Sequence, residues 1–262
     1  MSEPHFASAG GHRLEYAWHG RGHRDRPPLV MLHEGLGSVS LWRDFPQRLA
    51  HATERRLLVY SRYGYGRSDP LTGPRGVDFM HVEALQTLPQ LLDALAIERP
   101  VLFGHSDGGS IALIYAGSGH PSHLAALIVE APHVFVEDLT VASIAALRDS
   151  YASTKLRERL ARHHGEHVDR LFTAWTDTWL SDDFRQWNIE GYLSHITCPA
   201  LVIQGRDDEY GTMKQVEAIA RDMKAGVETM MLDNCGHAPH VDCRDTVLEA
   251  SVAFLHRMRA TP

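Results

Sequence analysis

A serine between two glycines follows a short apolar run near the middle of the chain. The segment Val101–Gly109 reads VLFGHSDGG and leads into a helical pattern. In Gly-x-Ser-x-Gly on a strand-to-helix turn, the glycines permit a sharp bend that leaves the serine hydroxyl exposed. The competing interpretation is a glycine-rich turn in which the serine is incidental. The strand-to-helix context favours a nucleophilic Ser106.

A serine hydroxyl is a poor nucleophile at neutral pH, so it needs a base, and the base needs an acid. Both residue types occur downstream, each after an apolar run. The segment Gly205–Glu209 reads GRDDE, and the segment Asp233–His240 reads DNCGHAPH. The chain order is therefore serine, acid, histidine.

That order is typical of α/β-hydrolases and differs from the orders of the other serine-triad folds. The sequence resembles the α/β-hydrolase superfamily, and the matching landmarks extend over His33–Phe254. The resemblance implies that Ser106 is the nucleophile and that His237, in its Gly-His pair, is the base. It implies that Asp208 is the acid, because Asp208 lies three residues after the glycine that ends the preceding strand.

Three neighbours remain alternatives for these roles. His240 is a second candidate for the base, and otherwise a supporting or surface group. Asp207 and Glu209 are the other candidates for the acid, and otherwise carboxylates of a turn or of a helix start.

An oxyanion hole needs two backbone N–H groups that point at one place. The resemblance implies Asp107, directly after the nucleophile, as one donor and Gly35, in the loop HEGLG, as the other. Glu34 stands where the superfamily usually has glycine. Two interpretations of Glu34 stay open: it faces the site and holds a cationic group, or it pairs with a basic residue such as Arg62. The pairing is favoured.

The elements that must position these residues follow from hydrophobic patterning. Short apolar runs alternate with longer helical patterns, which predicts an α/β fold: a mostly parallel sheet flanked by helices. After a hairpin at Arg13–Trp18, the expected strands are Leu29–Leu32, Leu57–Tyr60, Val101–Phe103, Leu127–Val129, Leu201–Ile203 and Thr229–Leu232. The expected helices are Leu41–Ala52, Val82–Leu95, Ser110–Ala116, Met213–Met223 and Val247–Arg259. Open parallel sheets bind ligands at the carboxyl ends of their strands.

The strand pattern stops after the sixth strand, and amphipathic helical stretches follow one another. Such an insertion predicts a helical cap over residues 132–196, with the hydrolase core formed by 1–131 and 197–262. We expect Phe135, Trp175 and Trp179 to line a substrate pocket, because aromatic surface provides most of the affinity for small apolar groups. The alternative is that they form the core of the cap itself.

Composition narrows the classes of function. The chain has 26 Lys and Arg against 33 Asp and Glu, a net charge of −7, which gives no reason to expect nucleic acid or anionic lipid as a partner.

No apolar run is long enough to cross a membrane and no signal segment is evident, which favours a cytoplasmic location. The three cysteines suggest neither disulfides nor a zinc site. His163 and His164 are expected at the surface. We therefore expect no metal and no cofactor.

The motif Gly-x-Ser-Asp-Gly-Gly resembles the valacyclovir-hydrolase-like and small carboxylesterase members of the superfamily. The resemblance implies hydrolysis of small carboxylic esters, including amino-acid esters or lactones, through an acyl-enzyme. It also implies that the Asp107 side chain attracts a substrate ammonium group, although Asp107 can instead simply begin a helix. The alternatives are a carbon–carbon bond hydrolase of aromatic-ring-cleavage products and a slow ligand receptor on the same fold. The partner is a small-molecule ester, and a homodimer is compatible with the sequence.

Overall fold

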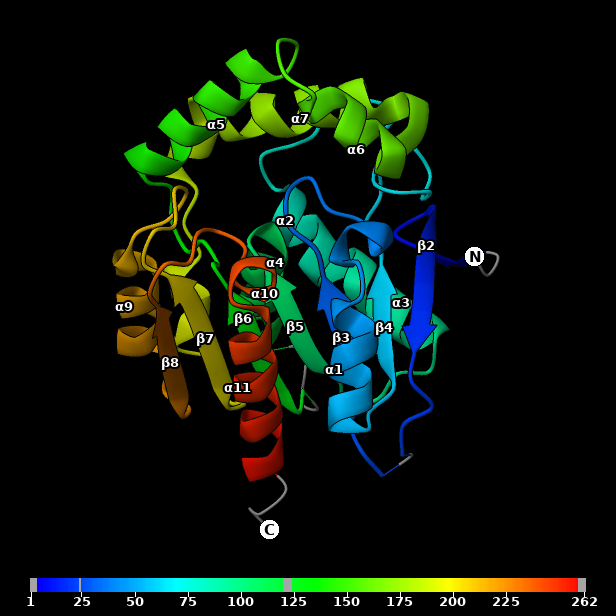
Figure 1. The fold of residues 1–262 in the computed structure, drawn as a ribbon, viewed down its shortest axis with the longest axis vertical. Coiled ribbons are helices and arrows are strands. Elements are labelled where there is room, and N and C mark those ends of the chain that lie inside the picture. Colours follow the sequence, from blue (N-terminus) through cyan, green and yellow to red (C-terminus); the bar gives the residue numbers. More distant parts are fainter. Residues whose placement is uncertain (1–3, 24, 120–123, 259–262) are drawn as a thin grey trace.

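The computed structural model describes residues 4–23, 25–119 and 124–258. Its centre is an eight-stranded sheet in the order β1-β2-β4-β3-β5-β6-β7-β8 (Figure 1). The strands are β1 His5–Ala9, β2 His12–His19, β3 Leu29–Leu32, β4 Leu57–Tyr60, β5 Val101–His105, β6 Ala126–Glu130, β7 Ala200–Gly205 and β8 Val227–Leu232. Strand β2 pairs antiparallel with both β1 and β4, and all pairs among β3 to β8 are parallel. The predicted fold class is confirmed.

Both faces of the central strands are covered, which explains why they are continuous apolar runs. In β5, Leu102 faces one apolar cluster with the helices α3, α4 and α9, while Val101 and Phe103 face another with α1 and α11. Because successive side chains of a strand point to opposite faces, a single strand contributes to both layers. Figure 1 shows α1 and α11 together on one side of the sheet.

Most helices begin and end within about three residues of the predicted limits. The helices are α1 Phe45–Thr53, α2 Phe79–Val82, α3 Leu88–Ala94, α4 Asp107–Gly117, α5 Asp138–Ser150, α6 Leu156–His164, α7 Val168–Trp179, α8 Glu190–Leu193, α9 Met213–Asp222, α10 Pro239–Asp242 and α11 Arg244–Arg257. The predicted helix Val82–Leu95 is instead the end of α2, a π-helical turn at Glu83–Thr87 and then α3. The predicted helix Leu41–Ala52 is two elements, a short turn Val39–Trp42 and then α1. The chain breaks there because Arg43 adopts a positive φ of 54°, which ends the turn. Arg259, the predicted end of the last helix, lies outside the described residues.

The segment after β6 is helical, and α5, α6 and α7 gather above the carboxyl edge of the sheet (Figure 1). A cluster of Leu160, Val168 and Phe172 holds α6 and α7 together and also packs against Leu36 of the core. The short helix α8 instead packs on α4 and α9 of the core. The helices that cover the sheet edge are thus α5 to α7. Within the described residues, no helix combines the length and apolarity needed to span a bilayer.

Candidate active site

Ser106 occupies the turn between β5 and α4, with a φ of 52° and a ψ of −120°. A non-glycine residue in this region is strained, and such strain is typical of functional positions. A side chain on Gly104 would clash with the backbone of Gly108, and one on Gly108 would clash with the carbonyl of Leu32. The two glycines of the motif are therefore required by the close approach of strand and helix.

The structure brings Ser106, His237 and Asp208 into one hydrogen-bonded chain, although they come from three different loops. The Oγ of Ser106 lies 2.9 Å from Nε2 of His237. The Nδ1 of His237 donates to the carboxylate of Asp208, at 2.8 Å and 2.9 Å from its two oxygens. This is the geometry of a nucleophile, a base and an orienting acid.

Asp208 is held as an anion by its surroundings. Burial acts to raise the pKa of Asp208, but the hydrogen bonds from His237 and from the backbone N–H of Tyr210 outweigh it and leave that pKa below its usual value. The alternative acids, Asp207 and Glu209, have exposed side chains. The alternative base, His240, lies 2.7 Å from Glu130 through its Nδ1 and takes no part in the chain of three.

Gly35 and Asp107 line the same cavity as Ser106. Within the described residues, neither backbone amide donates a hydrogen bond. Asp107 is the first residue of α4, where helix geometry leaves N–H groups without intrahelical partners. A side chain on Gly35 would clash with the indole of Trp175. Both predicted oxyanion donors are thus unpaired and beside the serine.

The favoured prediction, that the side chain of Glu34 pairs with Arg62, is wrong. Arg62 Nη2 donates to the backbone carbonyl of Glu34, at 2.9 Å. The Glu34 carboxylate instead lies 3.7 Å from Nδ1 of His105, and its side chain remains 29% exposed. Glu34 also lines the cavity, so it faces the site, as the other interpretation required.

The carboxylate of Asp107 has partners in the protein. It accepts a hydrogen bond from Trp175 Nε1 at 3.1 Å, and Arg62 Nη2 lies 3.9 Å away. The side chain is 1% exposed. Burial raises the pKa of Asp107, and the positive charge of Arg62 opposes that rise only in part. Asp107 therefore does begin a helix, and it also lines the cavity.

The cavity above Ser106 has a volume of about 120 Å³. Its lining consists of Glu34, Gly35, Leu36, Ser106, Asp107, His133, Thr140, Ile144, Leu147, Trp175, Trp179, Tyr210 and His237. The predicted Trp175 and Trp179 are among them. The predicted Phe135 is not, because it pairs with Asn188 in an isolated bridge between backbone segments and packs on the main core.

Sequence reasoning missed three residues of α5 that line this cavity, Thr140, Ile144 and Leu147. Their spacing of four and then three residues places them on one face of a helix. Because a helical cap is expected over these residues, that spacing is a signal from which a cavity-facing side of the helix could be predicted. Tyr210 and His133 carried no such signal, since each reaches the cavity from a loop.

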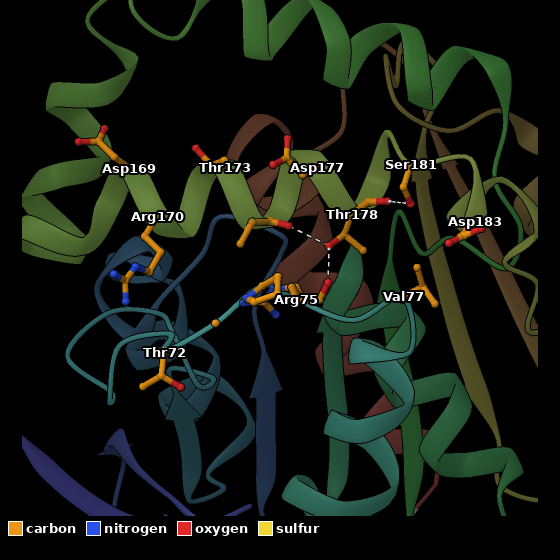
Figure 2. Close-up of a pocket in the computed structure, with 13 residues that line it drawn as sticks. Thr72, Arg75, Val77, Asp169, Arg170, Thr173, Asp177, Thr178, Ser181 and Asp183 are labelled. Carbon is orange, nitrogen blue, oxygen red and sulfur yellow. Dashed lines mark hydrogen bonds between the residues drawn. The ribbon is translucent and has the colours of Figure 1, made fainter.

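A larger groove, of about 700 Å³, lies on the other side of α7 (Figure 2). Thr173, Asp177 and Thr178 line it from the helix, and Arg75 lies beneath them. Arg75 packs over Tyr65, with 4.9 Å from its guanidinium carbon to the ring centroid. The groove contains neither the serine nor the histidine of the hydrogen-bonded chain, so the smaller cavity is the candidate active site.

The prediction that His164 is at the surface is wrong. His164 is buried, accepts from the backbone N–H of Gly66 through Nδ1 and donates to the carbonyl of Leu36 through Nε2. Burial lowers its pKa to about 4. Burial likewise lowers the pKa of His133 to about 3. Across the described residues, no group of three or more His, Cys, Asp or Glu side chains could hold a metal ion.

The loop after β4 supports the oxyanion segment. Ser61 accepts from the backbone N–H of Val39 and donates to Glu15. The N–H of Arg62 donates to Nε2 of His33 at 3.1 Å. These contacts fix the backbone on both sides of Gly35.

Comparisons with known proteins agree with this fold. The chain is 24% identical to a proline iminopeptidase of Lactobacillus crispatus (strain ST1), over 86% of this chain and 88% of the relative. It is 26% identical to a 2-hydroxy-6-oxononadienedioate/2-hydroxy-6-oxononatrienedioate hydrolase of Paraburkholderia xenovorans (strain LB400), over 80% of each chain. The solved structure of VinJ superposes with a TM-score of 0.73 at 24% identity, covering 98% of this chain and 99% of that one. Residues 27–181 match the family described as alpha/beta hydrolase fold, and the chain belongs to this hydrolase family.

Proposed function

We propose that the protein is a serine hydrolase that cleaves small carboxylic esters through an acyl-enzyme. The observation that carries the proposal is the chain from Ser106 Oγ through His237 to Asp208, with contacts of 2.8–2.9 Å, beside the unpaired amides of Gly35 and Asp107. These parts supply a nucleophile, a base and a site for negative charge. The reaction needs no metal or cofactor.

In the first step, His237 Nε2 takes the proton of Ser106 as Oγ attacks the carbonyl carbon of the ester. The carbonyl oxygen becomes negative and faces the amides of Gly35 and Asp107. The intermediate collapses, the carbon–oxygen bond to the alcohol breaks, and His237 returns its proton to that alcohol. Asp208 stabilises the imidazolium formed between these events.

In the second step, water attacks the acyl carbon while His237 accepts one of its protons. The bond to Oγ breaks, the free acid leaves, and His237 returns the proton to Ser106. Each cycle therefore consumes one ester and one water and restores the enzyme.

The cavity suggests the substrate class. A volume of about 120 Å³ is well below the roughly 300–1,000 Å³ of pockets that hold drug-sized ligands, so the acyl group is small. Among the lining residues the acidic side chains are Glu34 and Asp107, and none is Lys or Arg. Carboxylates repel an anionic substrate and attract a cationic one. The proposed substrates are therefore short neutral esters, including lactones, and amino-acid esters.

The same observation weighs against the carbon–carbon bond hydrolase. The relative in Paraburkholderia is named for a dioate, a dianion, and binding a dianion calls for cationic groups in the cavity. The cationic Arg62 lies behind Asp107 and is not part of the lining. An amine-bearing substrate has the opposite charge and fits the lining better.

The test is hydrolysis of p-nitrophenyl esters of increasing acyl length, with and without a serine-directed phosphonate. We expect rapid release from acetyl to butyryl esters, loss of activity after phosphonate treatment, and covalent labelling of Ser106 in mass spectrometry. Ser106→Ala should fold normally and lose both turnover and labelling. A slow receptor would bind ester without rapid release, and this outcome would contradict the proposal.

A further inference from the structure

His105 lies directly beneath the candidate active site, between two of its loops. It is the last residue of β5, and its neighbour in sequence is Ser106. Its Nε2 lies 2.7 Å from the backbone carbonyl oxygen of His237. Its Nδ1 lies 3.7 Å from Oε2 of Glu34. The side chain is 3% exposed.

Sheet register explains how Glu34 and His105 meet. The strands β3 and β5 are parallel neighbours, and Leu32 is paired with Gly104. Glu34 follows β3 by two residues, and His105 ends β5, so both side chains start from the same edge of the sheet. Their proximity is a consequence of the fold and does not depend on a long flexible loop.

The two contacts favour a protonated His105, whose Nδ1, at 3.7 Å, forms an ion pair and no hydrogen bond with Glu34. A carbonyl oxygen only accepts, so Nε2 must carry a hydrogen. A neutral ring would then present the lone pair of Nδ1 to the Glu34 carboxylate, which also only accepts. A proton on Nδ1 removes that conflict and makes the ring an imidazolium between two acceptors. Burial acts to lower the pKa of His105, but Glu34 outweighs burial and raises it above 6.5. The pKa of Glu34 is lowered in return.

The other titratable groups around His105 are those of the loops that pack on it. The ring of His240 lies 4.9 Å away between centroids, and His240 is itself bonded to the buried Glu130. The charge of Glu130 also favours protonated His105. The ring of His237 lies 5.3 Å away, and the charge of His105 contributes to keeping His133 neutral. Carboxylates thus flank His105 from the loop after β3 and from the end of β6.

We propose that Glu34 and protonated His105 are a positioning pair that ties the oxyanion loop to the loop of the catalytic base. The inference rests on the proposed function, because it assigns its effect to the amide of Gly35 and to His237. Glu34 directly precedes Gly35, and His105 directly precedes Ser106. The Nε2–H of His105 also donates to the backbone carbonyl of His237. The ion pair with Glu34 and the hydrogen bond from Nε2 to His237 together connect the three segments that must align, which gives a reason for glutamate at this position of the loop.

Three variants test the pair on a neutral butyryl ester. Glu34→Gln keeps the size of residue 34 and removes its charge. His105→Gln keeps an N–H donor near the position of Nε2 and removes the imidazolium. Each single variant should lower kcat about tenfold with little change in KM, since small misplacement of catalytic groups is costly. The double variant should be no slower than the worse single variant, because both act through one contact.

The pH profile separates positioning from a general loss of packing. As the pH rises through the pKa of His105, the imidazolium is lost, so kcat of the wild type should fall on the alkaline side. Glu34→Gln and His105→Gln should both abolish this fall, because neither variant has an ion pair that His105 deprotonation could break. Asp207→Asn removes an exposed carboxylate near the site and should leave the profile unchanged. An alkaline limb that persists in Glu34→Gln would overturn the proposal.

A second measurement does not depend on turnover. NMR titration of the His105 ring in Ser106→Ala should show protonation persisting above pH 6.5, and in Ser106→Ala/Glu34→Gln the midpoint should fall. A His105 that is neutral at pH 6 in the folded protein would refute the pair.

If the wild type hydrolyses no ester and takes up no phosphonate, the proposed function fails, and this titration still decides whether the pair exists. If Glu34→Gln changes only KM, and only for amino esters, Glu34 is a substrate-binding group and the positioning role is wrong.

Discussion

Trp175 donates its indole N–H to the carboxylate of Asp107 across 3.1 Å. Trp175 belongs to α7 above the sheet, and Asp107 is the residue after Ser106. The same indole lies so close to Gly35 that no side chain fits there. A single residue of the cap helices thus contacts both proposed oxyanion donors. The position of α7 and the shape of the oxyanion site are therefore coupled.

The first prediction concerns the acid. Asp208→Asn should lower kcat by about 10³- to 10⁴-fold, because the amide cannot hold the imidazole in its working tautomer or stabilise its cation. Asp207→Asn is the matched control, since its side chain is exposed one residue earlier in the same loop. Its activity should stay within about twofold of the wild type. Steady-state kinetics on a butyryl ester decide, and a damaging Asp207→Asn with a nearly normal Asp208→Asn would reverse the assignment.

The core of this site could be predicted from the sequence because its signals are local. Apolar runs such as Leu57–Tyr60 coincide with the observed strand, and the glycines around Ser106 are demanded by the turn itself. Strand ends then brought the serine, acid and histidine to one edge of the sheet. Each of these inferences needs only a few neighbouring residues.

The supporting contacts could not be predicted in this way. The pairs of His105 with Glu34, and of His240 with Glu130, join residues 71 and 110 positions apart. Which of several nearby polar groups such a side chain meets depends on rotamers and on loop paths, and no periodicity records these. Glu34 shows the limit: its identity is unusual for this position of the loop, but its partner is a histidine of the neighbouring strand and not the expected arginine.

The second prediction concerns the contact between cap and core. Trp175→Phe keeps an aromatic ring but removes the hydrogen bond to the buried carboxylate of Asp107. The free energy of unfolding should fall by about 1–3 kcal/mol, the cost of leaving a buried acceptor without its donor. Trp187→Phe is the matched control, because Trp187 is also buried and its Nε1 has no hydrogen-bond partner among the described residues. Urea unfolding measures both, and equal losses would show that the hydrogen bond is not what stabilises this contact.

The third prediction concerns acyl length. Trp179 lines the cavity, so Trp179→Leu should enlarge it and move the preferred p-nitrophenyl ester from short to longer acyl chains. Phe135→Leu should not shift the preference, because Phe135 lies outside the lining. The ratio of kcat/KM between hexanoyl and butyryl esters is the readout. No shift in Trp179→Leu would mean that Trp179 serves only to pack the cap.

The fourth prediction concerns substrate charge. With Glu34 and Asp107 in the lining, kcat/KM should decrease from a valine ester to its neutral isovaleryl analogue, and decrease again to a hemisuccinate ester. Asp107→Asn should narrow the difference between the valine and isovaleryl esters. Because Arg62 partly compensates Asp107, we expect a change of only about threefold to tenfold, far below an unscreened interaction. A wild type that prefers the hemisuccinate would exclude both carboxylates from recognition.

The last prediction concerns stability in mild acid. Three of the buried histidines have a lowered pKa: burial lowers the pKa of His33 well below 6.5, that of His133 to about 3 and that of His164 to about 4. Below pH 6.5 the unfolded chain binds protons at these side chains and the folded chain does not. The contribution of these neutral histidines to the free energy of unfolding is therefore fully present above pH 6.5. It is lost as the pH falls toward their pKa values in the folded protein, at about 1.4 kcal/mol per pH unit for each histidine. His105 does not offset this loss below pH 6, because its raised pKa leaves it protonated in both states there.

Urea midpoints between pH 7.5 and 5 should fall steeply for the wild type. His133→Gln should remove about one proton from that slope, whereas His256→Gln, at an exposed position of α11, should leave it unchanged. A slope that is identical in His133→Gln and the wild type would show that His133 takes up its proton in the folded protein.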